Sequence, residues 1–161
     1  LLPSAMDQYT EMIDSSGITE YSILWAVATL ILPPIVEETI FRGLILQYLG
    51  RAGAGFVVAN LIQAVLFGVF HMNLVQGIYT ALLGFLLGWL AYRYDSTLVP
   101  MLLHAIFNLF GTVLVDLESR FLPDIVLTLI ILVSVPLLIV TILMIHFGVG
   151  EKKKKIREVQ Q

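Results

Sequence analysis

The feature that most constrains the fold is a cluster of charge inside a long apolar run. Residues 23–48 contain only three charged side chains, those of Glu37, Glu38 and Arg42. On insertion scales, each charge at the centre of a membrane helix costs about 2.5–3.5 kcal/mol. The cluster therefore either builds a site within the membrane or marks a segment that does not cross it.

The rest of the chain has the composition of an integral membrane protein. Hydrophobic residues make up 58% of the sequence and charged residues 13%, and several apolar runs approach the ~20 residues that a membrane helix needs. We predict an all-α, polytopic transmembrane helical bundle with about five membrane helices, at residues 21–49, 56–72, 75–94, 98–115 and 125–147. Pro33-Pro34 is expected to end or kink one helix within the first run and start the next, because proline removes an amide donor.

Charge divides the chain into three predicted regions. Residues 1–20 carry acidic side chains without Lys or Arg and are interpreted as an extramembrane segment. Residues 21–147 form the membrane core, and residues 148–161 form a basic tail. No second domain is expected at this length.

The distribution of Lys and Arg predicts the orientation. With the basic tail inside, Arg51 and Arg93 also face the cytoplasm, and Arg120 alone lies outside. The protein is thus expected to cross its membrane several times, with its amino end outside and its carboxyl terminus in the cytoplasm. We expect this membrane to be a bacterial cell membrane. The chain has no cysteine, which excludes disulfides and thiolate chemistry. It also lacks a nucleic-acid patch, and no nucleic-acid partner is expected. Its apolar runs make membrane lipids its expected surroundings.

The charged cluster divides into two parts by helical spacing. Glu38 and Arg42 are four residues apart, so they can form an ion pair on one helix face. Glu37 points about 100° away from Glu38. We assign the pair a bracing role and leave Glu37 free to act as a base, although Glu38 could instead contribute directly to the site. The alternative is a buried Glu–Arg–Glu network that serves packing alone.

Two later segments each present a polar face. Phe67 and His71 lie one turn apart at the end of the second segment, and His104 and Asn108 are four residues apart in the fourth. Each pair alone is compatible with ordinary hydrogen bonding. Because ionisable groups within a membrane usually face one another or water, we expect the three faces to meet at one cavity.

Such a constellation supports hydrolysis by water in two ways. In the first, Glu37 and His71 activate a water while His104 and Asn108 donate to the oxyanion, with no cofactor. In the second, Glu37, His71 and His104 hold a zinc ion with an open water position. The sequence contains no HExxH motif, so the zinc model rests on residue types alone.

Helix geometry predicts different depths in the membrane for His104 and for Glu37 and His71. Glu37 and His71 both rise roughly 20–24 Å from the loop at residues 50–55. His104 rises only about 12–14 Å from the loop at Asp95 if both loops lie at one level. We expect either a tilt of the helices or a deeper position of the Asp95 loop.

The third segment carries small residues at helical spacing. Gly84 and Gly88 form a small-xxx-small pair that lets helix backbones approach closely. We favour packing within the bundle over a dimer contact.

The three motifs together resemble those of the CAAX protease and bacteriocin-processing (CPBP, or Abi) family, which includes the type II CAAX prenyl endopeptidases. The resemblance rests on EExxxR, FxxxH and HxxxN in order, and it covers about residues 21–147. It implies an intramembrane endopeptidase with a water-filled cavity. Carried over, the site residues are Glu37, Glu38, Arg42, His71, His104 and Asn108, with Phe67 as a further motif position.

The resemblance also implies a substrate and partners. The expected reaction is hydrolysis of a peptide bond in a membrane-associated substrate, either a prenylated protein or a leader peptide. Family members usually carry about three further helices before the first motif, so additional helices or a membrane-protein partner are expected. A different class of function stays open, in which the chain is a catalytically silent scaffold or bacteriocin-immunity protein that regulates a cell-envelope enzyme.

Overall fold

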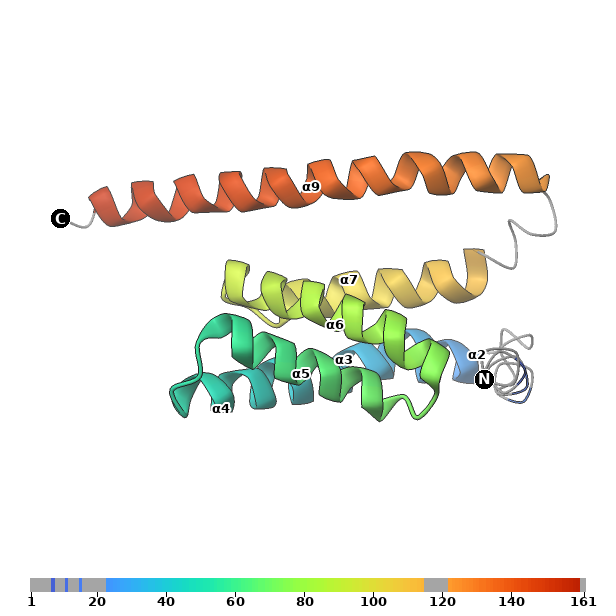
Figure 1. Cartoon of the computed structure of the whole chain (residues 1–161), viewed down its shortest axis with the longest axis horizontal. Helices are drawn as coiled ribbons and strands as arrows, with labels where there is room; N and C mark the ends of the chain where they lie inside the picture. Colours follow the sequence, from blue (N-terminus) through green and yellow to red (C-terminus); the bar gives the residue numbers. More distant parts are fainter. Residues whose placement is uncertain (1–6, 8–10, 12–14, 16–22, 115–121, 160–161) are drawn as a thin grey trace. The chain divides into compact units, whose positions relative to one another are not determined.

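The computed structural model describes residues 7, 11, 15, 23–114 and 122–159 (Figure 1). Within these residues the elements are helices joined by short turns, with no strand. Three helices are long and apolar enough to cross a membrane, and two further apolar helices are shorter; their bounds are Ile23–Arg51, Leu74–Tyr94 and Thr128–Gly148, then Phe56–Phe70 and Leu98–Val113. The prediction of an all-α polytopic membrane protein with about five helices is confirmed.

The chain forms two compact units, which are described separately. The first, Leu1–Leu109, holds helices α2 to α7, and the second, Phe110–Gln161, holds η4 and α9. In the first unit the elements are α2 Ile23–Ala26, η2 Val27–Ile31, α3 Leu32–Glu38, η3 Thr39–Ile45, α4 Leu46–Arg51, α5 Phe56–Phe70, α6 Leu74–Tyr94 and α7 Leu98–Leu109. In the second they are η4 Phe110–Leu114 and α9 Asp124–Val159.

The first apolar run is one helix of 29 residues that alternates between α and π geometry. The prolines do not end it, which corrects that part of the prediction. Instead, a π-helical segment, η2, precedes them, and Pro33-Pro34 occupy the first turn of α3, where proline is tolerated. A second π-helical segment, η3, begins directly after Glu38. Such segments are rare and occur frequently at functional sites.

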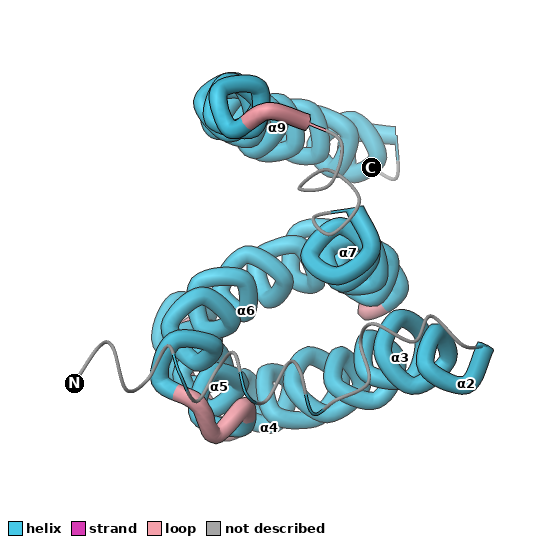
Figure 2. The backbone as a smooth tube through the Cα atoms, turned by 90° about the vertical axis from the view of Figure 1, so that its right-hand side faces the viewer, coloured by secondary structure: helices cyan, strands magenta, loops and turns pink. Residues whose placement is uncertain are grey.

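Helices of the first unit follow one another around a ring (Figure 2). Helix α5 contacts α4 and α6, and α7 contacts α6 and α3. The helix that carries Glu37 and Glu38 is therefore flanked by α5, which leads to His71, and by α7, which carries His104. This order brings the three predicted polar faces into one bundle.

Small residues allow α5 and α6 to lie close together. A Cβ added to Gly88 would collide with Oδ1 of Asn60, and one added to Gly84 would meet Phe67 at 2.9 Å. Both glycines are buried between these helices. The prediction that Gly84 and Gly88 serve packing within the bundle is confirmed.

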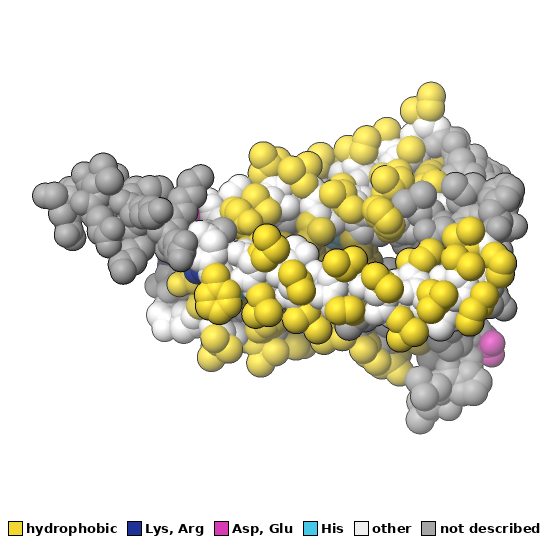
Figure 3. All heavy atoms as spheres, turned by 90° about the horizontal axis from the view of Figure 1, so that it is seen from above, with side chains coloured by type: hydrophobic (Ala, Val, Ile, Leu, Met, Phe, Trp, Pro, Cys, Tyr) yellow, Lys and Arg dark blue, Asp and Glu magenta, His cyan; other side chains and the backbone are white. Residues whose placement is uncertain are grey.

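The second unit is dominated by the long helix α9. Hydrophobic side chains follow the described part of α9 in Figure 3, and none of the described side chains in its apolar stretch at Thr128–Gly148 is buried. An unburied apolar surface of this length suits contact with lipid. The backbone of α9 continues to Val159, beyond the predicted end of the membrane segment at residue 147.

Three sequence predictions fall mainly outside the described residues. They are the acidic segment at residues 1–20, of which residues 7, 11 and 15 are described, the position of Arg120 between the last two predicted helices and the side chains of the basic tail. The boundaries predicted at residues 20 and 147 stay predictions.

Candidate active site

The ion pair predicted from the four-residue spacing is present. Nη1 of Arg42 donates to Oε1 of Glu38 at 2.7 Å, and both side chains are fully buried. Glu38 ends α3 and Arg42 lies in the π-helical segment that follows. A buried pair of this kind needs further hydrogen bonds to offset its loss of hydration.

Arg42 makes these further contacts with two other helices. Its Nη2 donates to the backbone carbonyl of Gly84 in α6 at 3.0 Å. Its guanidinium lies 4.5 Å from the ring centroid of Phe67 in α5, within the range of a cation–π interaction. One side chain thus links the charged helix to α5 and α6.

The Gly84 carbonyl is also an acceptor for Gln63, whose Nε2 donates to it at 2.9 Å and to Oδ1 of Asn60 at 2.7 Å. Asn60 in turn donates to the carbonyl of Phe85 at 3.0 Å. The motif spacings in the sequence do not predict the contacts of Asn60 and Gln63 with the α6 backbone. The small residues of α6 were the available signal, because they expose carbonyls to a neighbouring helix.

His104 of α7 lies between the two carboxylates. Its Nδ1 is 2.9 Å from Oε1 of Glu38, and its Nε2 is 3.8 Å from Oε2 of Glu37. An ionised carboxylate can only accept hydrogen bonds, so Nδ1 is the donor to Glu38. Glu38 therefore orients the ring, and Nε2 is the atom turned toward Glu37.

The adjacent carboxylates have different surroundings. Oε1 of Glu38 accepts from both Arg42 and His104. The Oε2 atoms of both Glu37 and Glu38 are buried without a hydrogen-bond partner among the residues that the structure describes. The Glu37 side chain is 14% exposed, however, whereas that of Glu38 is fully buried. Buried polar atoms are normally paired, so Oε2 of Glu37 is suited to accept a hydrogen bond from a bound molecule that reaches this side chain.

Phe67 connects His71 to this group. Its ring meets the imidazole of His71 edge to face at 4.9 Å and that of His104 at 5.8 Å between centroids. The Nδ1 atom of His71 is 2.8 Å from the carbonyl of Phe67. A carbonyl is only an acceptor, so Nδ1 carries hydrogen and Nε2 holds the lone pair of the neutral ring. The predicted common face of Phe67 and His71 is confirmed.

Asn108 is directed to the first helix rather than to the carboxylates. Its Nδ2 donates to the backbone carbonyl of Thr29 in η2 at 3.1 Å. Of the six candidate residues, the structure thus brings Glu37, Glu38, Arg42 and His104 into direct contact, reaches His71 through Phe67, and turns Asn108 toward Thr29. Their catalytic roles stay predictions.

The depth of His104 is explained by the turn between α6 and α7. The methyl group of Thr97 in this turn lies about 4.0 Å from where a Cβ on Gly43 would stand. Gly43 is eight residues, or about 12 Å, before Arg51, after which the loop between α4 and α5 begins. The turn between α6 and α7 therefore lies deeper than the loop between α4 and α5. This is the deeper position of the Asp95 loop that we expected as one of two possibilities, and it brings His104 to the level of Glu38.

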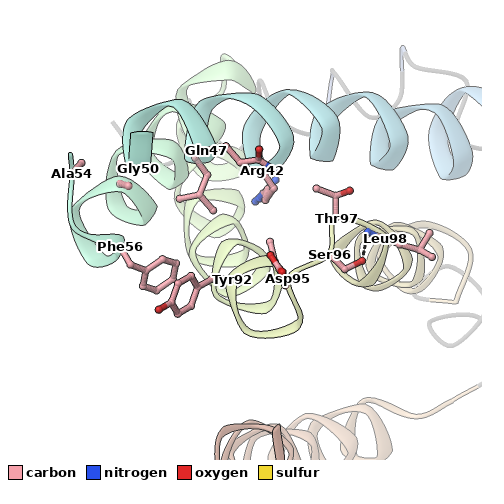
Figure 4. A pocket seen from close by; sticks show the side chains of 13 residues that line it. Arg42, Gln47, Gly50, Ala54, Phe56, Tyr92, Asp95, Ser96, Thr97 and Leu98 are labelled. Carbon is pink, nitrogen blue, oxygen red and sulfur yellow. Dashed lines mark hydrogen bonds between the residues drawn. The ribbon is translucent and has the colours of Figure 1, made fainter. Parts of the chain in front are cut away.

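A cavity of about 760 Å³ is lined on one side by this deep turn (Figure 4). The Arg42 side chain points into it, and Asp95, Ser96 and Thr97 of the turn form part of its wall. The remaining lining residues are Leu46, Gln47, Gly50, Ala54, Phe56, Ala59, Ala91, Tyr92 and Leu98. Arg42 is thus both a partner of Glu38 and a wall of the cavity.

The side chains do not match a zinc centre in their described positions. No group of three or more His, Asp or Glu residues within the described ranges is arranged to hold a metal ion. Glu37 and His104 are close, and the hydrogen bond from Nδ1 of His104 to Glu38 is compatible with metal binding through Nε2, but no third ligand joins these two side chains within the described ranges. No step of the chemistry is therefore derived through a metal.

Comparison with known proteins gives two matches. The family model described as type II CAAX prenyl endopeptidase Rce1-like matches residues 19–110, a stretch that includes all six candidate residues. The chain is also similar to the "Putative membrane peptidase YdiL" of Bacillus subtilis (strain 168), with 34% identity over 95 residues. That alignment covers 59% of this chain and 38% of the relative, so the chain spans well under half of the relative's length. No solved structure matches.

Proposed function

Since the chain belongs to the type II CAAX prenyl endopeptidase Rce1-like family, we propose that it is an intramembrane endopeptidase that cleaves with activated water. The observation that carries the proposal is the unpartnered Oε2 of Glu37, buried 3.8 Å from Nε2 of His104. Two atoms at this separation can both contact one water at about 2.8 Å. A base and a second polar atom then meet at a single reacting molecule.

The proposed reaction assigns Glu37 as the general base. Its Oε2 takes a proton from the water while the water oxygen bonds to the scissile carbonyl carbon. Nε2 of His71 accepts the second hydrogen of that water and orients it. When the tetrahedral intermediate collapses, the C–N bond breaks and Glu37 returns the proton to the leaving amine.

His104 and Asn108 are the proposed donors to the oxyanion. Because Nδ1–H of His104 is committed to Glu38, donation from Nε2 requires the imidazolium form. Asn108 donates one amide hydrogen to the Thr29 carbonyl, and in this scheme it donates its second to the oxyanion. Glu38 and Arg42 do not touch the reacting atoms in this scheme. They hold the His104 ring in place.

The proposed substrate is a membrane-associated peptide, either prenylated or a leader peptide. The site lies within apolar helices, so a substrate with a lipid or apolar anchor reaches it from the membrane. The proposed orientation in a bacterial cell membrane, with the carboxyl end in the cytoplasm, places Glu37 and His71 in the outer half. A leader or exported peptide fits that depth better than a cytosolic prenylated tail.

The test is cleavage by the full chain in proteoliposomes. The probes are a farnesylated peptide ending in a CAAX sequence and an unprenylated leader peptide, each with a fluorophore and quencher. We expect Glu37→Gln to lower cleavage by about 10²–10⁴-fold, the usual contribution of a general base. Glu11→Gln is the control, because Glu11 is exposed and takes no part in the site.

Retained cleavage in Glu37→Gln would overturn the proposed mechanism. If neither probe is cleaved and the biological effect of the protein survives Glu37→Gln, the scaffold or immunity function is the correct one. Circular dichroism of both variants establishes that the helices are intact in each comparison.

A further inference from the structure

Pro33-Pro34 leave one backbone carbonyl without a donor from its own helix. In α geometry the Thr29 carbonyl accepts from the amide four residues on, which is position 33. In π geometry it accepts from the amide five residues on, which is position 34. Both positions are proline and have no N–H. Thr29 is the residue whose carbonyl loses its partner in either register.

The structure supplies the missing donor from another helix. Nδ2 of Asn108 in α7 donates to the Thr29 carbonyl at 3.1 Å. The residues adjoining this carbonyl have π geometry, and the Leu32 amide donates five residues back to Val27. Within a membrane no bulk water can serve a freed carbonyl, so a neighbouring side chain is the remaining partner.

We propose that Pro33-Pro34 and Asn108 form a positioning device that sets the height and rotation of α7 against the first helix. The prolines create a single strong acceptor at Thr29, and Asn108 is the complementary donor. His104 lies one turn before Asn108 on α7, so the same contact fixes where the imidazole meets Glu38 and Glu37. Asn108 is in this respect a positioning residue, in addition to any contact with the oxyanion.

The device is needed because the Glu38–His104 contact cannot set its own register. A carboxylate accepts hydrogen bonds over a broad range of directions, so α7 could slide or rotate and keep that bond. A second fixed point one turn away removes this freedom. The link to catalysis rests on the proposed function, whereas the hydrogen bond and its origin in the two prolines do not.

The first experiment observes the Thr29 carbonyl directly. Labelling with [1-13C]Thr and [15N]Leu gives signals for the Thr-Leu pairs alone, which are 29–30, 97–98 and 128–129. The Thr29 signal is identified by its loss in Thr29→Ser. We expect Asn108→Ala to move this signal upfield, because the carbonyl loses its donor, and to leave the other two unchanged. An unmoved Thr29 signal overturns the proposal.

The second experiment is rescue. Pro33→Ala restores an amide at the position that serves Thr29 in α geometry, so Pro33→Ala/Asn108→Ala is expected to return the carbonyl signal toward its wild-type position. Where Asn108→Ala alone does not accumulate as folded protein, the double variant is expected to do so. Pro136→Ala is the control, since it removes another proline inside a helix without supplying Thr29.

Cleavage measurements then test whether the contact between Asn108 and Thr29 affects catalysis. A misplaced His104 is expected to lower kcat by about a hundredfold in Asn108→Ala, with KM unchanged and partial recovery on adding Pro33→Ala. Equal rescue by Pro136→Ala would show that helix stabilisation alone is responsible and would overturn the proposal. Absence of cleavage in the wild-type protein, with the carbonyl shifts as expected, overturns the proposed function and leaves the positioning device standing.

Discussion

Adjacent carboxylates in this protein differ because of their partners. Glu38 shares one oxygen between Arg42 and His104, while Oε2 of Glu37 faces His104 at 3.8 Å without a hydrogen bond among the described residues. Oε2 of Glu38 also has no hydrogen bond among the described residues, but the Glu38 side chain is fully buried whereas that of Glu37 is 14% exposed. A water can therefore reach Glu37 more easily, and Glu37 is the better base.

Removing Arg42 tests its bracing role. Arg42→Met is expected to lower the free energy of unfolding by about 3–5 kcal/mol, because it leaves the buried Glu38 without its ion partner. Equilibrium unfolding in detergent micelles measures this loss. Arg51→Met is the matched control, since Arg51 is exposed and surface substitutions change stability by about 0.5 kcal/mol or less.

The pair can also be examined as a double-mutant cycle. Glu38→Gln/Arg42→Met is expected to lose less stability than the sum of the losses in the two single variants. In the double variant both charges are removed, so neither is left buried without its partner. Strictly additive losses would contradict a direct interaction and would mean that each side chain is held by separate contacts.

At the level of elements, close approach of α5 and α6 makes the site. The carbonyl of Gly84 accepts from Arg42 and Gln63, which is feasible only where no side chain covers the α6 backbone. A glycine at this position has a specific purpose. It lets two side chains from other helices reach one carbonyl.

Gly88→Ala tests this close packing. Its Cβ would collide with Oδ1 of Asn60 and approach Nε2 of Gln63 to 2.6 Å. We expect a loss of about 1–3 kcal/mol in unfolding free energy, as overpacking usually costs. Gly50→Ala is the control, because nothing lies within 4 Å of the added methyl group. A neutral Gly88→Ala would contradict the described contact between α5 and α6.

For the whole molecule, the membrane orientation is proposed from the distribution of Lys and Arg. The absence of cysteine allows single cysteines to report it. We expect Asp7→Cys to react with a membrane-impermeant maleimide on intact cells, and Gln161→Cys to react only after lysis, because basic segments stay inside. The reverse labelling pattern would invert the proposed topology.

Whether cleavage depends on a metal ion can be tested on the whole protein. No described set of three side chains suits a metal ion, so we expect cleavage to persist after dialysis against a chelator. Elemental analysis of the same sample measures bound zinc. Loss of cleavage that returns specifically with zinc would favour the second scheme, in which Glu37, His71 and His104 converge on a metal.

Helical spacing alone determined the features that depend on neighbouring residues in the chain. The apolar runs predicted the membrane helices, and the four-residue spacing predicted the Glu38–Arg42 pair and the Phe67–His71 contact. These follow because residues three or four apart share one helix face whatever the rest of the chain does.

Only the tertiary structure decided which groups meet across helices. His104 bonds to Glu38 because the turn at Thr97 lies beside Gly43, deeper than the loop after Arg51. Sequence spacing carries no measure of that depth. The two prolines signalled a disturbed helix, but not that Asn108 would serve the freed Thr29 carbonyl. Contacts between helices depend on the height and rotation of each helix, and packing in three dimensions sets both.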